Sequence, residues 1–105
     1  YIEVKNVHLM RTDRLAEFPD SITSRGAKHL AELSEMVKGG HRGIMVYLIQ
    51  RGDCDQFKLC RDLDVAYCQA FDAAVANGVE AFAIRCQISV TDIIPETLIP
   101  VVEPA

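Results

Sequence analysis

The chain has 105 residues, half of them hydrophobic and a quarter charged, and its formal net charge is −4 at pH 7. This composition is typical of one globular domain with a single core and excludes global disorder. The longest apolar run, residues 43–49, is too short to span a bilayer, and we recognise no signal peptide. An acidic chain binds nucleic acid poorly unless a local basic groove or a basic partner domain supplies clustered Lys and Arg.

Residues 1–9 combine β-branched and aliphatic residues without Gly or Pro, which predicts a β-strand. Side chains two positions apart in a strand share a face, so Ile2 and Val4 point one way and Glu3 and Lys5 the other. The Glu3-x-Lys5 pattern has two interpretations. It is either a solvated ion pair on an edge strand, or a site where the carboxylate holds a divalent cation and the lysine positions a water against a phosphodiester.

Residues 10–17 are polar and predict either a loop or a short second strand, closed by Phe18-Pro19-Asp20. Asp20 or Ser21 is then expected to cap a helix that runs to about Lys38 and ends at Gly39-Gly40. The predicted core stripe of this helix consists of Ile22, Gly26, Leu30, Leu33 and Val37. The predicted polar stripe consists of Arg25, His29 and Glu32. A glycine in the buried stripe also predicts the close approach of another backbone.

A second helix is expected to begin after Asp64 as its N-cap and to end near Asn77, with Gly78 as the stop signal. Its predicted inward residues are Tyr67, Phe71, Ala74 and Val75. The four cysteines, Cys54, Cys60, Cys68 and Cys86, show neither Cys-x-x-Cys nor zinc-finger spacing. Their arrangement favours free thiols in a reducing cytosol over a Cys54–Cys60 disulfide or metal loop.

Two further strands complete the predicted order. Residues 42–50 predict a central strand covered on both faces, and residues 79–90 predict another strand. A charged loop is expected at 51–63 and an extended tail at 92–105, part of which could pack on the domain. The order strand, helix, strand, helix, strand indicates an α/β domain with right-handed crossovers. Because three clear strands make an incomplete sheet and no initiator Met is present, we expect a fragment whose N-terminal strands are missing.

Three runs of residues resemble the sugar fermentation stimulation protein A (SfsA) family. They are Glu3-Val4-Lys5-Asn6-Val7, Phe18-Pro19-Asp20-Ser21 and Arg25-Gly26-Ala27-Lys28-His29-Leu30-Ala31-Glu32-Leu33. The stretches Gly40-His41-Arg42, Asn77-Gly78-Val79-Glu80 and Ile99-Pro100-Val101 fit as well. The resemblance covers nearly the whole chain, and its Phe-Pro-Asp and Arg-Gly-x-Lys-His-Leu motifs are specific.

The resemblance implies an α/β fold with a mixed sheet flanked by helices, a restriction-endonuclease-like PD-(D/E)xK core truncated at its N-terminus. On this view residues 1–105 are a single nuclease-like C-terminal domain that lacks the family's N-terminal OB-like domain. Family members are cytoplasmic bacterial or archaeal proteins, described as DNA-binding and linked to the regulation of sugar (maltose) metabolism. The implied partners are DNA, the protein's own OB-like domain and a second copy in a homodimer, with no membrane.

The resemblance also implies roles for particular residues. Glu3, together with an acidic residue upstream of Tyr1, would bind Mg²⁺ or Mn²⁺, and Lys5 would orient the attacking water. Arg25 and His29 would hold the scissile phosphate. The alternative for this second pair is a solvated helix face beside Glu32.

Two more residues carry both a functional and a structural interpretation. Asp20 is either a further metal ligand near Glu3 or simply the helix N-cap. Lys28 either contributes to substrate binding or is solvent-exposed. Because one carboxylate binds Mg²⁺ weakly, we expect no strong nuclease activity from residues 1–105 alone.

The sequence therefore supports three functions. The first is a DNA-binding regulatory protein of sugar metabolism, of which this chain is the nuclease-like domain. The second is a metal-dependent nuclease or phosphodiesterase. The third is a structural or assembly domain, in which Glu3 and Lys5 form an ion pair and the Arg25/His29 face packs on another domain or on a second copy.

Overall fold

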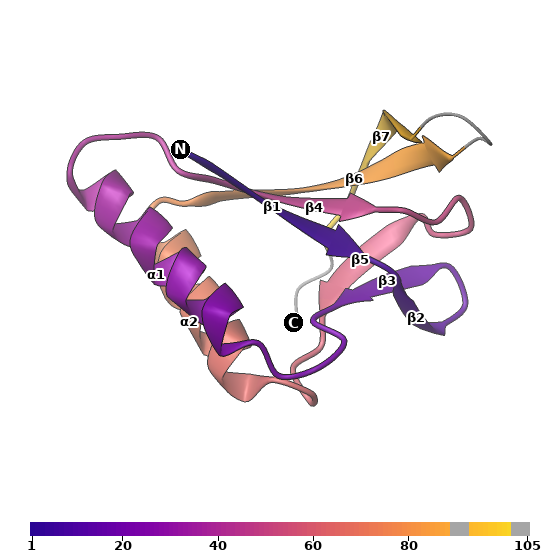
Figure 1. Cartoon of the computed structure of the whole chain (residues 1–105), viewed down its shortest axis with the longest axis horizontal. Helices are drawn as coiled ribbons and strands as arrows, with labels where there is room; N and C mark the ends of the chain where they lie inside the picture. Colours follow the sequence, from indigo (N-terminus) through magenta and orange to yellow (C-terminus); the bar gives the residue numbers. More distant parts are fainter. Residues whose placement is uncertain (89–92, 102–105) are drawn as a thin grey trace.

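The computed structural model of the chain describes residues 1–88 and 93–101. Within these residues the elements are β1 (Ile2–Val7), β2 (Leu9–Thr12), β3 (Leu15–Phe18), α1 (Ser24–Lys38), β4 (Ile44–Ile49), β5 (Gln56–Leu59), α2 (Val65–Ala76), β6 (Glu80–Ile88) and β7 (Ile93–Ile99) (Figure 1). Neither of the described helices is long and apolar enough to cross a membrane. The predicted α/β fold with a mixed sheet is confirmed.

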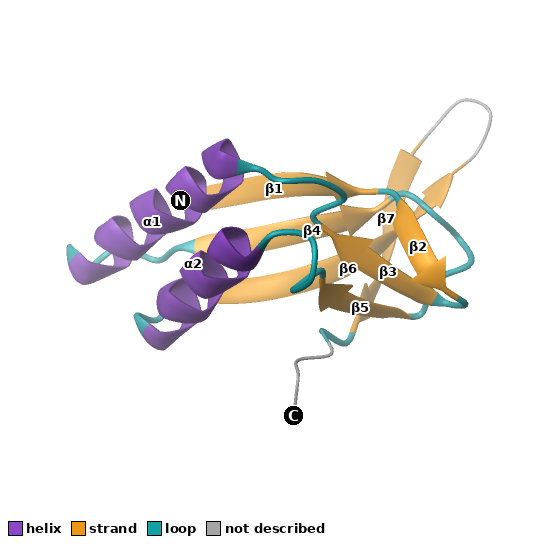
Figure 2. Ribbon diagram, turned by 90° about the horizontal axis from the view of Figure 1, so that it is seen from below, coloured by secondary structure: helices purple, strands orange, loops and turns teal. Residues whose placement is uncertain are grey.

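Two sheets organise the molecule. The larger sheet has the order β1-β4-β6-β7, in which β1, β4 and β6 are parallel and β7 runs antiparallel to β6. The smaller sheet has the order β2-β3-β5. Seen from below, the two helices lie side by side at one end of the molecule and the smaller sheet lies at the other (Figure 2).

The small sheet corrects two sequence-based expectations. Residues 10–17 contribute to a hairpin of two strands, β2 and β3, rather than to a loop or a single strand. The expected loop 51–63 contains β5, which pairs in parallel with β3. In β5 the burial alternates, because Phe57 and Leu59 enter the core and Gln56 and Lys58 stay exposed. This is the period of two that a half-buried strand requires, and four residues were too short a run to reveal it.

The start of α1 lies later than the sequence predicts. Its N-cap is Thr23, whose side chain accepts a hydrogen bond from the Gly26 backbone N–H at 3.0 Å, so neither Asp20 nor Ser21 is the cap. Ile22 consequently precedes the helix and is 79% exposed instead of lying in the core. A Cβ added at Gly26 would lie 3.0 Å from a ring carbon of Tyr67. Side chains, and not another backbone, therefore make the close approach at this glycine.

The second helix matches its prediction more closely. Asp64 is the N-cap, and the helix gives way to Asn77 and then to Gly78, which has a φ of +104°. Tyr67, Phe71 and Ala74 are buried as predicted, whereas Val75 is 46% exposed, so the expectation that it points inward was wrong. Position 75 lies one residue, about 100°, beyond Ala74 around the helix, which turns it away from the core.

The first part of the expected extended tail is a strand of the large sheet. Ile93–Ile99 forms β7, which pairs antiparallel with β6. Ile99 is buried, Leu98 is exposed and Val101 makes a single parallel bridge with Phe57. Residues 92 and 102–105 of the predicted tail lie outside the described residues.

Both helices pack on one face of the large sheet (Figures 1 and 2). On β4, the side chains on that face, Met45, Tyr47 and Ile49, have no exposed surface. The side chains that alternate with them, Ile44, Val46 and Leu48, are only half-buried. The sequence predicts that β4 is covered on both faces. The described residues cover only the face that carries Met45, Tyr47 and Ile49.

Candidate functional site

Three of the predicted site residues come together between β1 and α1. Strand periodicity turns Glu3 and Lys5 toward the helix-covered face of the sheet, and α1 presents His29 above them. The Nζ of Lys5 lies 2.9 Å from Nδ1 of His29, and Oε1 of Glu3 lies 3.2 Å from the same nitrogen. The side chains of His29 and Glu3 are 20% and 31% exposed, so the cluster is partly shielded from water but open to a ligand.

The shared nitrogen gives the cluster two hydrogen-bonding states. An ammonium can only donate, so the Lys5 contact requires Nδ1 of His29 without a proton. A carboxylate can only accept, so the Glu3 contact requires the same nitrogen to carry one. The two hydrogen bonds are therefore alternatives. The position of the proton on the imidazole therefore decides which of the two neighbours forms a hydrogen bond with Nδ1 of His29.

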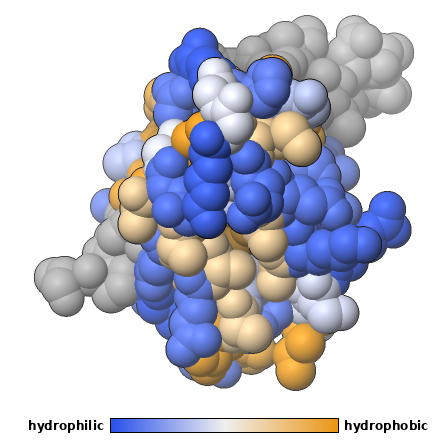
Figure 3. All heavy atoms as spheres, turned by 90° about the vertical axis from the view of Figure 1, so that its left-hand side faces the viewer, coloured by the Kyte–Doolittle hydropathy of each residue, from blue (hydrophilic) through white to orange (hydrophobic). Residues whose placement is uncertain are grey.

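A cavity of about 250 Å³ opens beside this cluster. Its lining residues are Tyr1, Ile2, Glu3, His29, Glu32, Leu33 and Met36. Carboxylates and apolar side chains dominate this wall, and Lys5 is not among the lining residues. The face of the molecule seen in Figure 3 is largely hydrophilic, with hydrophobic side chains gathered between the polar ones.

The other predicted site residues lie on the surface around the cluster. Arg25 and Lys28 are exposed on α1, and Nζ of Lys28 is 4.0 Å from Glu32. Asp20 is exposed in the loop that leads to α1. Within the described part of the chain, none of these three residues is joined to the Glu3–His29–Lys5 cluster by a hydrogen bond or an ion pair.

The donor set does not by itself suit a divalent metal. No group of three or more His, Cys, Asp or Glu side chains is placed to hold a metal ion among the residues that the structure describes. Glu3 and His29 offer one carboxylate and one imidazole, and the ammonium of Lys5 lies next to them. Mg²⁺ prefers six oxygen ligands and commonly more than one carboxylate. Residues 1–88 and 93–101 therefore do not complete an Mg²⁺ or Mn²⁺ site.

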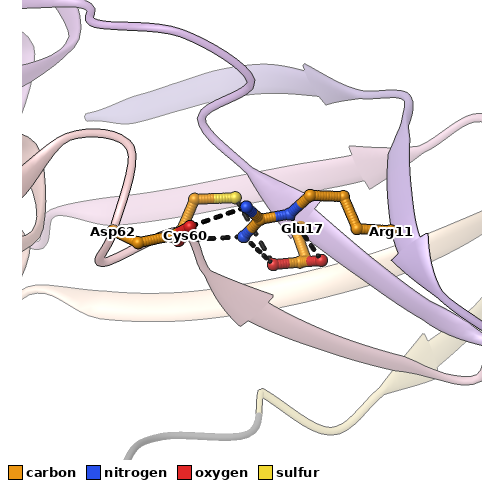
Figure 4. Close-up of polar contacts among 4 residues, drawn as sticks. All are labelled: Arg11, Glu17, Cys60 and Asp62. Carbon is orange, nitrogen blue, oxygen red and sulfur yellow. Dashed lines mark hydrogen bonds and ion pairs between the residues drawn. The ribbon is translucent and has the colours of Figure 1, made fainter.

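A second polar cluster was not predicted from the sequence. It joins β2, β3 and the segment after β5 through Arg11, Glu17, Cys60 and Asp62 (Figure 4). Arg11 donates to both carboxylate oxygens of Glu17, at 3.2 and 2.6 Å, and to both of Asp62, at 2.7 and 2.9 Å. The Cys60 thiol donates to Glu17 at 3.6 Å. Glu17 is only 3% exposed, so this guanidinium neutralises a buried charge.

The electrostatics of this cluster indicate a structural role. Hydrogen bonds from Arg11 lower the pKa of Glu17 and lower that of Asp62 to about 2. Burial, reinforced by the Glu17 charge, raises the pKa of Cys60 to about 12. A thiol that stays protonated is a poor nucleophile. The only sequence signal for the cluster is the pair Arg11 and Glu17, which a tight hairpin brings together across β2 and β3.

Residues 1–92 match the family model described as the sugar fermentation stimulation protein RE domain. The sugar fermentation stimulation protein homolog of Rhizobium meliloti is 59% identical over 104 residues, which cover 99% of this chain and 44% of that protein. The homolog of Rhizobium rhizogenes is 57% identical over 104 residues, with 99% and 42% covered. The chain thus spans less than half the length of the curated relatives that it matches.

One solved structure shows the same fold. The structure of Pyrococcus furiosus SfsA in complex with Ca²⁺ has a TM-score of 0.87 and 24% sequence identity to this chain. The matched region comprises 97% of this chain and 44% of the Pyrococcus furiosus chain. The described strands and helices are therefore retained, at low sequence identity, inside a longer polypeptide.

Proposed function

The chain belongs to the sugar fermentation stimulation protein (SfsA) family, and on that premise we propose that it is the nuclease-like domain of a cytoplasmic, DNA-binding protein that regulates sugar metabolism, maltose use included. The observation that carries the proposal is the convergence of Lys5, His29 and Glu3 between β1 and α1. A lysine ammonium that donates one hydrogen bond to an imidazole nitrogen keeps two further donors for a phosphate oxygen. The four cysteines are buried and form no disulfide, which fits a reducing compartment.

DNA contact would use the side chains around this cluster. Arg25 and Lys28 extend from the exposed side of α1, on the same helix as His29. Guanidinium and ammonium groups are the usual partners of backbone phosphates. Because the chain carries a net charge of −4, most of the affinity must come from elsewhere in the full-length protein, for which an OB-like domain is the natural candidate.

The test is a binding titration of the full-length protein with labelled DNA at several salt concentrations. We expect Lys5→Gln and Arg25→Gln each to weaken binding and to reduce the slope of log affinity against log salt by about one. Lys38→Gln is the matched control, since Lys38 is exposed at the far end of α1 and pairs with Glu35. Absence of binding at low salt would reject the proposal. Loss of assembly or stability in Arg25→Gln, with DNA affinity unchanged, would instead support a structural domain.

A second candidate function is metal-dependent phosphodiester cleavage. The proximity of a carboxylate, an ammonium and an imidazole in the Glu3–His29–Lys5 cluster favours it. Because the described residues do not complete a cation site, further acidic ligands for Mg²⁺ or Mn²⁺ would have to come from other parts of the protein. The test is Mn²⁺-dependent cleavage of DNA by the full-length protein, with Glu3→Ala and Lys5→Ala as variants. Cleavage that both variants retain would exclude this site as its source.

A further inference from the structure

The loop between β3 and α1 carries Ile22, which at 79% exposure is the most exposed large apolar side chain among the described residues. It follows Asp20 and Ser21, which are also exposed, and precedes Thr23, the N-cap of α1. A single exposed aliphatic side chain is common on protein surfaces and needs no partner. What distinguishes Ile22 is that the chain is held on both sides of it and that it lies close to the cations of α1.

The chain on both sides of Ile22 is anchored to the rest of the molecule. On the N-terminal side Pro19 is fully buried. On the C-terminal side the backbone N–H of Thr23 donates to the carboxylate of Asp64 at 2.7 Å. Only residues 20–22 are exposed between these two anchors. A side chain on a support that is already ordered loses less conformational entropy when it inserts into a partner, so the loop presents Ile22 in a preorganised way.

The groups proposed to contact phosphate lie within reach of Ile22. Arg25 is exposed on the first turn of α1, three residues after Ile22. The helical rise of 1.5 Å per residue places position 29 about 10 Å from position 22 along the axis of α1. Phosphates of one DNA strand follow each other about every 3.4 Å along the duplex axis. A duplex that runs along α1 with one phosphate at the Glu3–His29–Lys5 cluster therefore reaches Ile22 about three base pairs away.

We propose that Ile22 is a wedge that enters between two base pairs of the DNA that the full-length protein binds, an inference that rests on the proposed DNA-binding function. Residues 19–24 contain no Lys or Arg, and Asp20 would repel a phosphate, so this loop is unsuited to the DNA backbone. An aliphatic side chain has no hydrogen bond to offer a base edge either. Proteins that hold phosphates with neighbouring cations use Ile, Leu, Met or Phe to unstack a base step and kink the duplex.

The experiment compares the affinity of the full-length protein for two labelled duplexes, one fully paired and one with a single central mismatch. A mismatched step costs less to unstack, so the wild type should bind the mismatched duplex about tenfold more tightly. Ile22→Ala should bind the two duplexes equally, within about twofold, whereas Ile22→Leu, which keeps the aliphatic bulk, should retain the preference. Val75→Ala is the matched control, because Val75 is 46% exposed on α2. Ile22→Ala should keep the wild-type urea midpoint, since the side chain is largely exposed.

The dependence on salt separates a wedge from a phosphate contact. Ile22→Ala removes no charge, so the slope of log affinity against log salt should stay that of the wild type, whereas Arg25→Gln should reduce it by about one. A wild type that binds DNA without preferring the mismatch, or a preference that Ile22→Ala retains, would overturn the wedge and leave the DNA-binding function standing. No binding of either duplex at low salt would overturn both. Dissociation of an oligomer in Ile22→Ala, with the preference retained, would overturn the wedge and place Ile22 in a protein interface.

Discussion

The carboxylate of Asp64 fixes Thr23, and through this contact it connects the starts of both helices. One oxygen of Asp64 accepts a hydrogen bond from the Tyr67 backbone N–H at 3.0 Å, which caps α2. The other oxygen accepts from the Thr23 backbone N–H at 2.7 Å, where Thr23 is itself the cap of α1. Asp64 is 5% exposed, so its carboxylate is largely shielded from water.

Asp64→Ala is therefore expected to destabilise the fold by about 2–4 kcal/mol, because it removes an N-cap and leaves a second, part-buried backbone N–H without its partner. Asp64→Asn should cost less, since its amide keeps one acceptor oxygen for one of the two donors. Urea unfolding measures both changes. Asp55→Ala is the control, because Asp55 forms an exposed pair with Arg14. An effect of Asp64→Ala no larger than that of the control would refute the double-cap role.

Arg11→Leu should destabilise the protein more than Arg14→Leu. Both arginines form ion pairs, but only Arg11 neutralises a buried carboxylate, that of Glu17. Leaving Glu17 buried without its partner costs about 1–3 kcal/mol or more, whereas an exposed pair such as Arg14–Asp55 contributes little. The comparison of the two urea midpoints at neutral pH checks this. The double variant Arg11→Leu, Glu17→Leu should recover part of the loss, since it removes the unpaired charge.

The same cluster predicts how stability depends on pH. Arg11 holds the pKa of Glu17 below its ordinary value of 4.5. A carboxyl group with a lowered pKa in the folded protein contributes stability above its unfolded pKa and loses it as the pH falls through the folded pKa. The protein should therefore lose stability from about pH 4.5 downward, and Arg11→Leu should flatten this part of the profile. If stability falls with pH in the same way in the wild type and in Arg11→Leu, then carboxylates other than Glu17 determine the pH dependence.

The sequence was most informative where one residue decides a local structure. Asp64 was identified as a cap and Gly78 as a stop because their chemistry acts within a few residues of chain. Glu3, Lys5 and His29 were grouped by strand and helix periodicity together with family resemblance, and the structure brings these three side chains into contact.

Longer-range packing explains the predictions that failed. Asp20, Ser21 and Thr23 are all good caps, and what selects Thr23 is a hydrogen bond from its backbone to Asp64, 41 residues away. The Arg11–Glu17–Asp62 cluster likewise depends on pairing between β2 and β3 and on the chain after β5. Periodicity within a short window contains no information about either contact.

The four cysteines should be unreactive until the protein unfolds. Each is buried and forms no disulfide, and burial raises the pKa of Cys54, Cys60 and Cys86. Because the thiolate is the reactive form, both access and ionisation oppose modification. A disulfide reagent at neutral pH should therefore titrate none of these thiols in the native chain and all four in denaturant. Fewer than four thiols in denaturant, restored by reduction, would indicate the disulfide that the structure lacks.

The tautomer of His29 is the most direct test of the cluster between β1 and α1. The contact of Nδ1 with the Lys5 ammonium, at 2.9 Å, is the shorter of its two contacts, and it predicts that Nδ1 of the neutral imidazole is the acceptor and that Nε2 carries the proton. In Lys5→Met the remaining neighbour of Nδ1 is the Glu3 carboxylate at 3.2 Å, which can only accept, so the proton should move to Nδ1. Glu3→Gln, with Lys5 intact, should keep the wild-type tautomer.

Nitrogen-15 chemical shifts of the imidazole distinguish these forms at a pH where the ring is neutral. The expected result is an unprotonated Nδ1 in the wild type and in Glu3→Gln, and a protonated Nδ1 in Lys5→Met. If the wild type carries its proton on Nδ1, then Glu3 and not Lys5 holds the imidazole, and Lys5 is free of His29. In that event Lys5→Met would leave the shifts unchanged, and the lysine would contact DNA without the support of the ring.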